Sequence, residues 1–103
     1  MNWLGKLLGA GILAVALAVT PALGQTQQQR SDEAYAAFNS GDYDRAYSIA
    51  RPLADEGFLE AQNLVAYLFE IGGGVEQSYE QALRWYRRAA DQGSDYAENA
   101  LGV

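Results

Sequence analysis

Residues 43–63 read YDRAYSIARPLADEGFLEAQN, and residues 79–99 read YEQALRWYRRAADQGSDYAEN. The second stretch repeats the first at an offset of 36 residues, with the same residue types in the same order: Tyr43, Ala46, Ala54, Gly57, Ala61 and Asn63 recur as Tyr79, Ala82, Ala90, Gly93, Ala97 and Asn99. A period in the mid-thirties built from helical segments is typical of helix-turn-helix solenoids, whose units bury their apolar faces against one another. We therefore predict an all-α repeat solenoid of about five helices.

The spacing of apolar residues and the turn residues around this repeat place the individual helices. Apolar residues at intervals of three and four predict helices over residues 31–39, 42–57, 59–70, 78–93 and 95–103. Pro52 predicts a kink or a break near Ser48, because proline lacks the backbone donor and clashes with the preceding turn. The triple glycine at 72–74 predicts a turn through backbone conformations that other residues avoid, with Val75 packed back onto the core.

The first two dozen residues are expected to be a leader that precedes the domain. Lys6 comes just before an apolar run from Leu7 to Val19, and Pro21 and a small-residue cleavage site follow, which is the layout of a secretory signal peptide over residues 1–24. We expect cleavage after Gly24, which makes the mature protein periplasmic or secreted. The alternative is an uncleaved membrane anchor, since the apolar run approaches the length needed to span a bilayer.

The rest of the chain divides into a linker and one repeat domain. Residues 25–30 are polar, rich in glutamine and without periodicity, and we interpret them as a flexible linker. The helical repeat domain covers residues 31–103, with a degenerate repeat, a full repeat and a partial repeat at 31–57, 58–93 and 94–103. The partial repeat lacks its partner helix, so it is either a terminal cap or the stub of a longer array.

Composition argues against several classes of function. Beyond residue 24 the chain carries six arginines, no lysine and thirteen acidic residues, so a nucleic-acid partner is not expected, because binding phosphates needs a basic surface. The chain contains no cysteine and no histidine. It therefore lacks the thiolate nucleophile that cysteine provides, the general base that histidine provides, and the soft metal ligands that both provide. We predict no enzyme activity, no metal site and no cofactor. The acid pairs Asp42 with Asp44 and Asp55 with Glu56 are ordinary solvated acids at helix ends, although a glycoside hydrolase also uses two acids.

The second half of the chain resembles a known repeat family. The resemblance is carried by Ala61-Gln62, Val65-Ala66, Gly72-Gly73-Gly74-Val75, Gln77-Ser78-Tyr79, Ala82, Trp85-Tyr86, Ala89-Ala90, Gln92-Gly93, Ala97 and Leu101-Gly102. In this pattern the chain is similar to the Sel-one-like repeat, a variant of the tetratricopeptide repeat with about 36 residues per helix pair. It departs from the family at Ala66, Phe69 and Ser78, where glycine, tyrosine and aspartate are usual, and these changes conserve size or capping.

The resemblance implies a protein-binding scaffold or assembly adaptor, and exported bacterial members of the family are associated with envelope assembly, polysaccharide export and contact with host cells. In helix-pair repeats the first helix of each unit presents the concave face, which singles out Tyr35, Gln62, Asn63, Tyr67, Glu70 and Asn99 as candidate protein-binding residues. Asn63 and Asn99 occupy equivalent positions and would form a ladder of amides able to hold a peptide backbone. The alternative is that Tyr35 and Tyr67 are half-buried packing residues.

We therefore expect an exported, non-enzymatic adaptor of the bacterial envelope that binds another protein or a peptide. After removal of the leader no contact with a membrane is expected, and the sequence leaves the oligomeric state open. The alternatives are an accessory subunit or small hydrolase of the envelope, or an incomplete N-terminal part of a longer repeat array.

Overall fold

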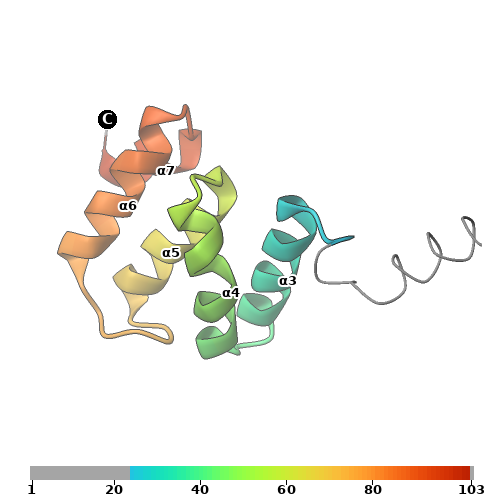
Figure 1. Ribbon diagram of the computed structural model, residues 1–103. Coiled ribbons are helices and arrows are strands. Elements are labelled where there is room, and N and C mark those ends of the chain that lie inside the picture. The colour runs from blue at the N-terminus through green and yellow to red at the C-terminus, as the bar shows by residue number, and fades with distance from the viewer. Residues whose placement is uncertain (1–23, 103) are drawn as a thin grey trace, which may run out of the picture.

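The computed structural model describes residues 24–102, and every regular element within them is an α-helix. The helices follow one another across the molecule (Figure 1) as α3 (Gln27–Asn39), α4 (Tyr43–Asp55), α5 (Leu59–Ile71), α6 (Tyr79–Asp91) and α7 (Asp95–Leu101). Each helix packs against the next one along the chain, and α3 also contacts α5. The prediction of an all-α helical repeat fold is therefore confirmed.

Side-chain caps begin four of these five helices. Thr26, Asp42, Ser78 and Ser94 each accept a hydrogen bond from the backbone N–H three residues further on, at 3.0–3.2 Å. Each bond satisfies a donor that the first turn of a helix leaves free. Pro52 lies in the last turn of α4, which runs unbroken to Asp55. The predicted break does not occur, because only one backbone bond is lost so close to the end of the helix.

Helix α3 begins before Ser31. Thr26 and Gln29 form a capping box, in which the Thr26 Oγ1 accepts from the Gln29 N–H at 3.0 Å and the Gln29 Oε1 accepts from the Thr26 N–H at 2.8 Å. Gln28 donates to Glu60 Oε2 of α5 at 2.8 Å, and Ser31 is fully buried inside the helix. The prediction of a flexible linker over 25–30 is therefore wrong from Gln27 onward, because polar side chains hold this first turn.

The core is built largely from alanine. The side chains with no exposed surface include Ala46, Ala50 and Ala54 on α4, Ala66 on α5 and Ala89 on α6. Such small side chains let the backbones of neighbouring helices approach closely. The larger core members are Leu53, Leu64, Val65, Leu68, Trp85 and Tyr86.

The loop between α5 and α6 is pressed against the start of α4. Gly74 has a φ of +72°, and a Cβ atom added there would lie 2.5 Å from the carbonyl oxygen of Tyr43. Gly73 is buried against Leu68 and Tyr43, and Val75 packs against the core. This confirms the predicted turn, and it shows that the loop also ties the second helix pair to the first.

The signal peptide predicted over 1–24 lies outside the described residues except for Gly24. Among residues 24–102, no helix has the length and apolar character needed to cross a bilayer.

Candidate protein-binding groove

A groove crosses α3, α5 and α7, the first helix of each successive pair. It has a volume of about 480 Å³ and is lined by Tyr35, Phe38, Asn63, Leu64, Tyr67 and Tyr96. Four of the six lining residues are aromatic, and they come from all three helices. The groove is therefore made by the stacking of units, and no single unit contains it. We call it the concave groove.

Tyr35 is held in the concave groove by a bond to the backbone of α5. Its hydroxyl donates to the carbonyl oxygen of Glu60 at 2.9 Å. Burial, and then the negative charges of Glu60 and of an ionised Tyr96, raise the pKa of Tyr35 to about 12. The phenol is thus a neutral, oriented group at ordinary pH.

Phe38 joins Tyr67 of the groove to the body of the domain. Its ring meets the ring of Tyr67 edge-on, with 5.6 Å between centroids, and lies 5.3 Å from the ring of Tyr43 on α4. Contacts of this kind favour edge-to-face geometry and fix the ring orientations. Tyr35 and Tyr67 are both half-buried, so each packs against its neighbours and also presents surface to the groove.

Asn63 lines the concave groove, but its amide already has a partner. The Asn63 Nδ2 donates to Ser94 Oγ at 3.0 Å, and the Ser94 hydroxyl lies 3.2 Å from Asn63 Oδ1. Ser94 Oγ in turn accepts from the Ala97 N–H at 3.1 Å. Asn63 therefore docks the start of α7 onto α5. Its repeat equivalent Asn99 is exposed and does not line the groove, so the two amides do not form a ladder there.

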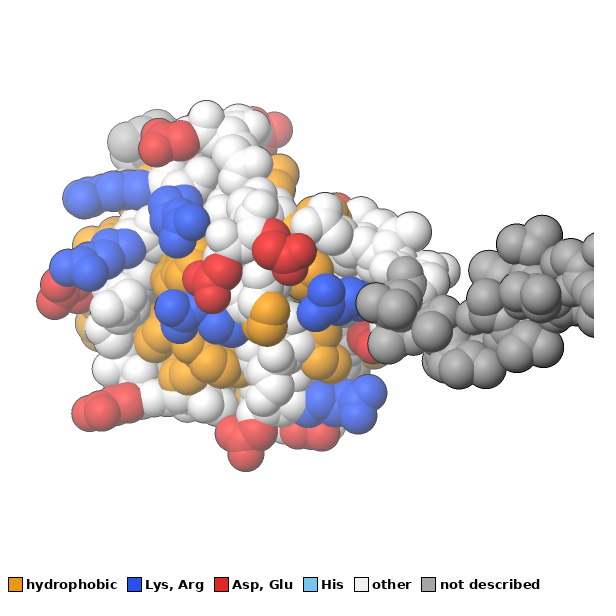
Figure 2. Space-filling view, viewed as in Figure 1, with side chains coloured by type: hydrophobic (Ala, Val, Ile, Leu, Met, Phe, Trp, Pro, Cys, Tyr) orange, Lys and Arg blue, Asp and Glu red, His pale blue; other side chains and the backbone are white. Residues whose placement is uncertain are grey.

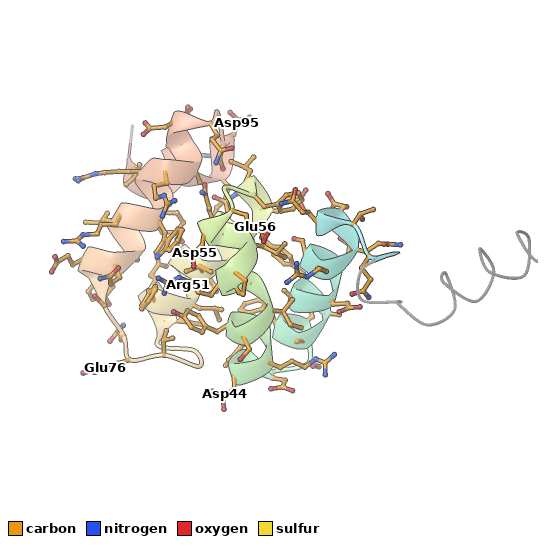
Figure 3. All side chains as sticks on the ribbon, in the orientation of Figure 1. Asp44, Arg51, Asp55, Glu56, Glu76 and Asp95 are labelled. Carbon is orange, nitrogen blue, oxygen red and sulfur yellow. The ribbon has the colours of Figure 1, made fainter. Side chains whose placement is uncertain are left out.

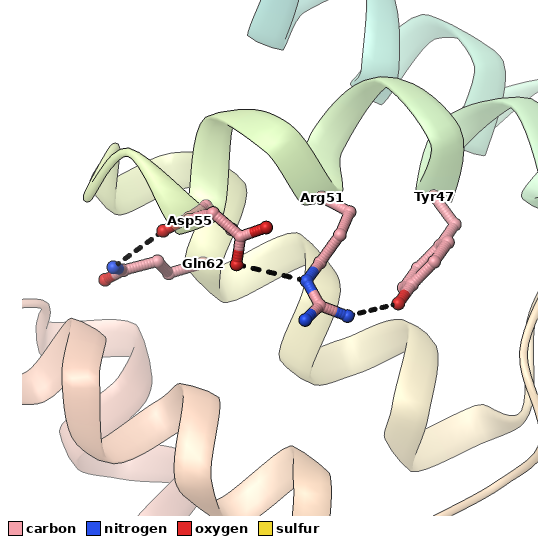
Figure 4. A network of polar contacts seen from close by, with 5 residues as sticks. Tyr47, Arg51, Asp55 and Gln62 are labelled. Carbon is pink, nitrogen blue, oxygen red and sulfur yellow. Dashed lines mark hydrogen bonds and ion pairs between the residues drawn. The ribbon is translucent and has the colours of Figure 1, made fainter.

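Gln62, a candidate protein-binding residue from the sequence, is a buried structural residue and does not line the groove. It is 2% exposed, and its Nε2 donates to the carbonyl oxygen of Ala54 at 3.2 Å (Figure 4). Its Oε1 accepts from Gln92 Nε2 at 2.7 Å, and Gln92 also donates to the Gly57 carbonyl at 3.0 Å. A buried amide with partners on both atoms satisfies the backbone at the end of α4 and ties it to the end of α6.

Glu70 lies beside the concave groove and does not line it. Its Oε1 accepts from the hydroxyl of Tyr86 at 3.3 Å, and the ring of Tyr86 lies 6.0 Å from that of Tyr96. Burial, followed by the contact with Tyr96 and the charge of Glu70, raises the pKa of Tyr86 well above its usual value.

Three lining residues were not among the candidates from the sequence, namely Phe38, Leu64 and Tyr96. Phe38 and Leu64 belong to the apolar stripes of their helices, so periodicity assigned them to the core. Tyr96 is 51% exposed on α7 and stands three residues before Asn99, on the same helix face. A large aromatic residue at that spacing from a candidate is the signal that identifies it.

One member of each acid pair that a hydrolase would need has a structural partner. Asp42 caps α4 through the Arg45 N–H at 3.2 Å, and Asp55 accepts from Arg51 Nε at 3.2 Å. Asp44, Asp55 and Glu56, labelled in Figure 3, are exposed on α4 and at the residue that follows it. Within residues 24–102, no three histidine, cysteine or acidic side chains are grouped so that they could hold a metal ion.

The fold and the concave groove define a class: helix-pair repeat proteins with a surface that spans several units. Residues 59–94 match the Sel1 repeat, so the chain carries a Sel1-like repeat, with α5 and α6 as its two helices. No solved structure matches the chain significantly. Sel1 repeats are protein-interaction modules.

Proposed function

We propose that this chain is a non-enzymatic adaptor that holds a segment of a partner protein in the concave groove. The observation that carries the proposal is the position of the groove, which runs across the three helices that begin successive units and gathers four aromatic rings. Sel1 repeats bind proteins, and a groove of this kind is the surface that a stack of such units creates.

The lining residues suit a protein partner for a physical reason. Tyrosine and phenylalanine offer a large contact area while losing few rotamers on binding, which makes aromatic residues common at the energetic centre of interfaces. Tyr35 and Tyr67 are already held by the contacts described above, so ordering them on binding costs little. Tyr96 is 51% exposed and has the most surface to lose to a partner.

We also propose that the protein works in the bacterial envelope or outside the cell. The support is the signal-peptide pattern of residues 1–24, with Lys6 before the apolar run and a small-residue site ending at Gly24. Expression of the full chain followed by fractionation and intact-mass measurement tests it. A mature protein that begins at Gln25 in the periplasm or medium is the expected result, and an unprocessed chain in the cytoplasm contradicts it.

The groove itself is tested by photo-crosslinking in cells that express the full chain. The crosslinker p-benzoylphenylalanine is placed at the position of Tyr67 or of Tyr96 in the groove. The position of Tyr79 on α6 is the matched control, since it is 64% exposed and does not line the groove. We expect a discrete adduct with another protein from Tyr67 and Tyr96 and none from Tyr79. Adducts from Tyr79 alone would show that a different face binds the partner.

A further inference from the structure

Charge is divided unequally between the two sets of helices. Residues 24–102 contain six arginines, and five of them, Arg45, Arg51, Arg84, Arg87 and Arg88, lie on α4 and α6. Figure 2 shows basic side chains, coloured blue, gathered over the face that α4 and α6 form. The helices that line the concave groove carry six acids and one arginine: Asp32, Glu33, Glu60, Glu70, Asp95 and Glu98 with Arg30. The groove thus belongs to the acidic set of helices, and arginine is concentrated elsewhere.

Two of these acids lie next to the groove at opposite ends of α5. The backbone of Glu60 is adjacent to it, because its carbonyl oxygen receives the Tyr35 hydroxyl, while the Glu60 carboxylate accepts from Gln28 Nε2 of α3 at 2.8 Å. At the other end of α5, the Glu70 carboxylate lies 3.3 Å from the Tyr86 hydroxyl, and the Tyr86 ring contacts Tyr96 of the groove. Asn63, Leu64 and Tyr67 lie between these acids along the same helix. The negative charge of Glu60 is also felt inside the groove, where it helps to raise the pKa of Tyr35.

The aromatic lining adds to the same preference. The face of a tyrosine or phenylalanine ring is negative, and it attracts an ammonium or guanidinium group within about 6 Å. None of the groove-lining residues is itself cationic, so nothing in the lining already occupies these rings. The same chain shows this chemistry on its other side, where Arg88 and Arg51 lie 4.4 and 5.2 Å from the centre of the Trp85 ring.

We infer that the concave groove selects an extended segment of a partner protein that carries lysine or arginine, with the cation set against the tyrosine rings between Glu60 and Glu70. This inference rests on the proposed function, and it adds the chemistry of the partner. Glu60 is exposed and Glu70 is half-buried, so salt weakens the selection.

The test is an affinity selection with the full chain, expressed and processed in its host, then immobilised. The probes are four synthetic peptide pools with degenerate flanks and a central position fixed as lysine, arginine, glutamate or norleucine. We expect the lysine and arginine pools to be retained about tenfold more than the other two at low salt. This excess should shrink in 0.5 M NaCl.

Two pairs of variants locate the effect. Glu60→Gln with Glu70→Gln removes two charges beside the groove, while Glu76→Gln with Asp91→Asn removes two charges from the 72–78 loop and from α6. Glu76 lies at the tip of that loop, far from α7 (Figure 3). We expect the first pair to lose most of the preference for lysine and arginine and the second to keep it. Circular dichroism on both pairs checks that the helices are intact.

The outcomes separate the two proposals. Equal retention of all four pools, abolished by Tyr67→Ala with Tyr96→Ala, leaves a peptide-binding groove and overturns the preference for cations. Retention of the basic pools that Tyr67→Ala with Tyr96→Ala does not change, or no retention of any pool, overturns the groove as the binding site and the inference with it.

Discussion

The guanidinium carbon of Arg51 on α4 lies 5.2 Å from the centre of the Trp85 ring on α6. Arg51 also donates to the Tyr47 hydroxyl at 2.6 Å and pairs with Asp55 at 3.2 Å (Figure 4). Trp85 is 4% exposed and has Arg88 on its ring as well, at 4.4 Å. Two helices that belong to different repeat units are therefore joined where the Arg51 guanidinium of α4 lies over the Trp85 ring of α6.

Replacing Arg51 should cost more stability than replacing an arginine with a comparable ion pair. Arg84 pairs with Glu80 at 2.9 Å on the exposed face of α6, whereas Arg51 has the Tyr47 bond and the Trp85 contact in addition. We expect Arg51→Ala to lower the free energy of unfolding by about 1 kcal/mol. Arg84→Ala should lower it by less than about 0.5 kcal/mol. Urea unfolding followed by Trp85 fluorescence measures both, and equal losses would contradict the linking role of Arg51.

Gly74→Ala should destabilise the fold more than Gly41→Ala. Gly74 and Gly41 have positive φ, at +72° and +83°, so an alanine at either position is held in a strained backbone conformation. Only at Gly74 does the new Cβ meet the Tyr43 carbonyl oxygen, at 2.5 Å, while nothing lies within 4 Å of the one at Gly41. We expect losses of about 1 kcal/mol for Gly41→Ala and about 2 kcal/mol or more for Gly74→Ala. Thermal unfolding followed by circular dichroism compares them, and a larger loss at Gly41 would be inconsistent with the packed loop.

Gln62→Ala should be among the more damaging single changes on α5. It removes a buried side chain and leaves the Ala54 carbonyl and the Gln92 amide without their partner. The expected loss is about 2–3 kcal/mol. Gln28→Ala is the control, since Gln28 is exposed and its bonds are to exposed acids, and it should change stability by less than about 0.5 kcal/mol. Chemical denaturation gives both values, and a neutral Gln62→Ala would show that the amide is not part of the core.

Alkaline pH should unfold the protein in part through Tyr35. Its pKa is about 12 in the fold, above the ordinary value of 10.0, so the fold favours the protonated phenol. This contribution is complete below pH 10, and it is lost as the pH rises from 10 through 12. In Tyr35→Phe the decline in stability above pH 10 should be shallower. The stability of the variant should still decline with rising pH, because the pKa of Tyr86 is also raised in the fold. Urea unfolding at a series of pH values measures the slopes, and identical slopes would rule out Tyr35 as a contributor.

Much of the fold could be read from local pattern, because alanine spacing, glycine turns and capping residues act over a few residues. The start of α3 was missed because it depends on the capping box of Thr26 and Gln29 and on the bond from Gln28 to Glu60, which is 32 residues away. Neither leaves an apolar period in the sequence.

The concave groove was only partly predictable. Tyr35, Asn63 and Tyr67 do meet there, since equivalent positions of stacked units lie side by side. Gln62 was assigned to the binding surface because its partner Gln92 is 30 residues away. The sequence of a single chain does not reveal which polar side chain has a buried partner that far along it. Tyr96 replaces the acid Glu60 at the repeat-equivalent position, so comparing the units did not single it out.

The alanine seam of the core has a consequence for how such a protein can change over evolution. Helix α4 packs against both α3 and α5, and Ala46, Ala50 and Ala54 on it have no exposed surface. A methyl group added at such a fully buried site overpacks the seam, and shifts of α3 and α5 that relieve the overpacking would alter the separation of Tyr35 and Tyr67. Substitutions in this buried seam can thus change the width of the groove while every residue that faces the partner stays the same.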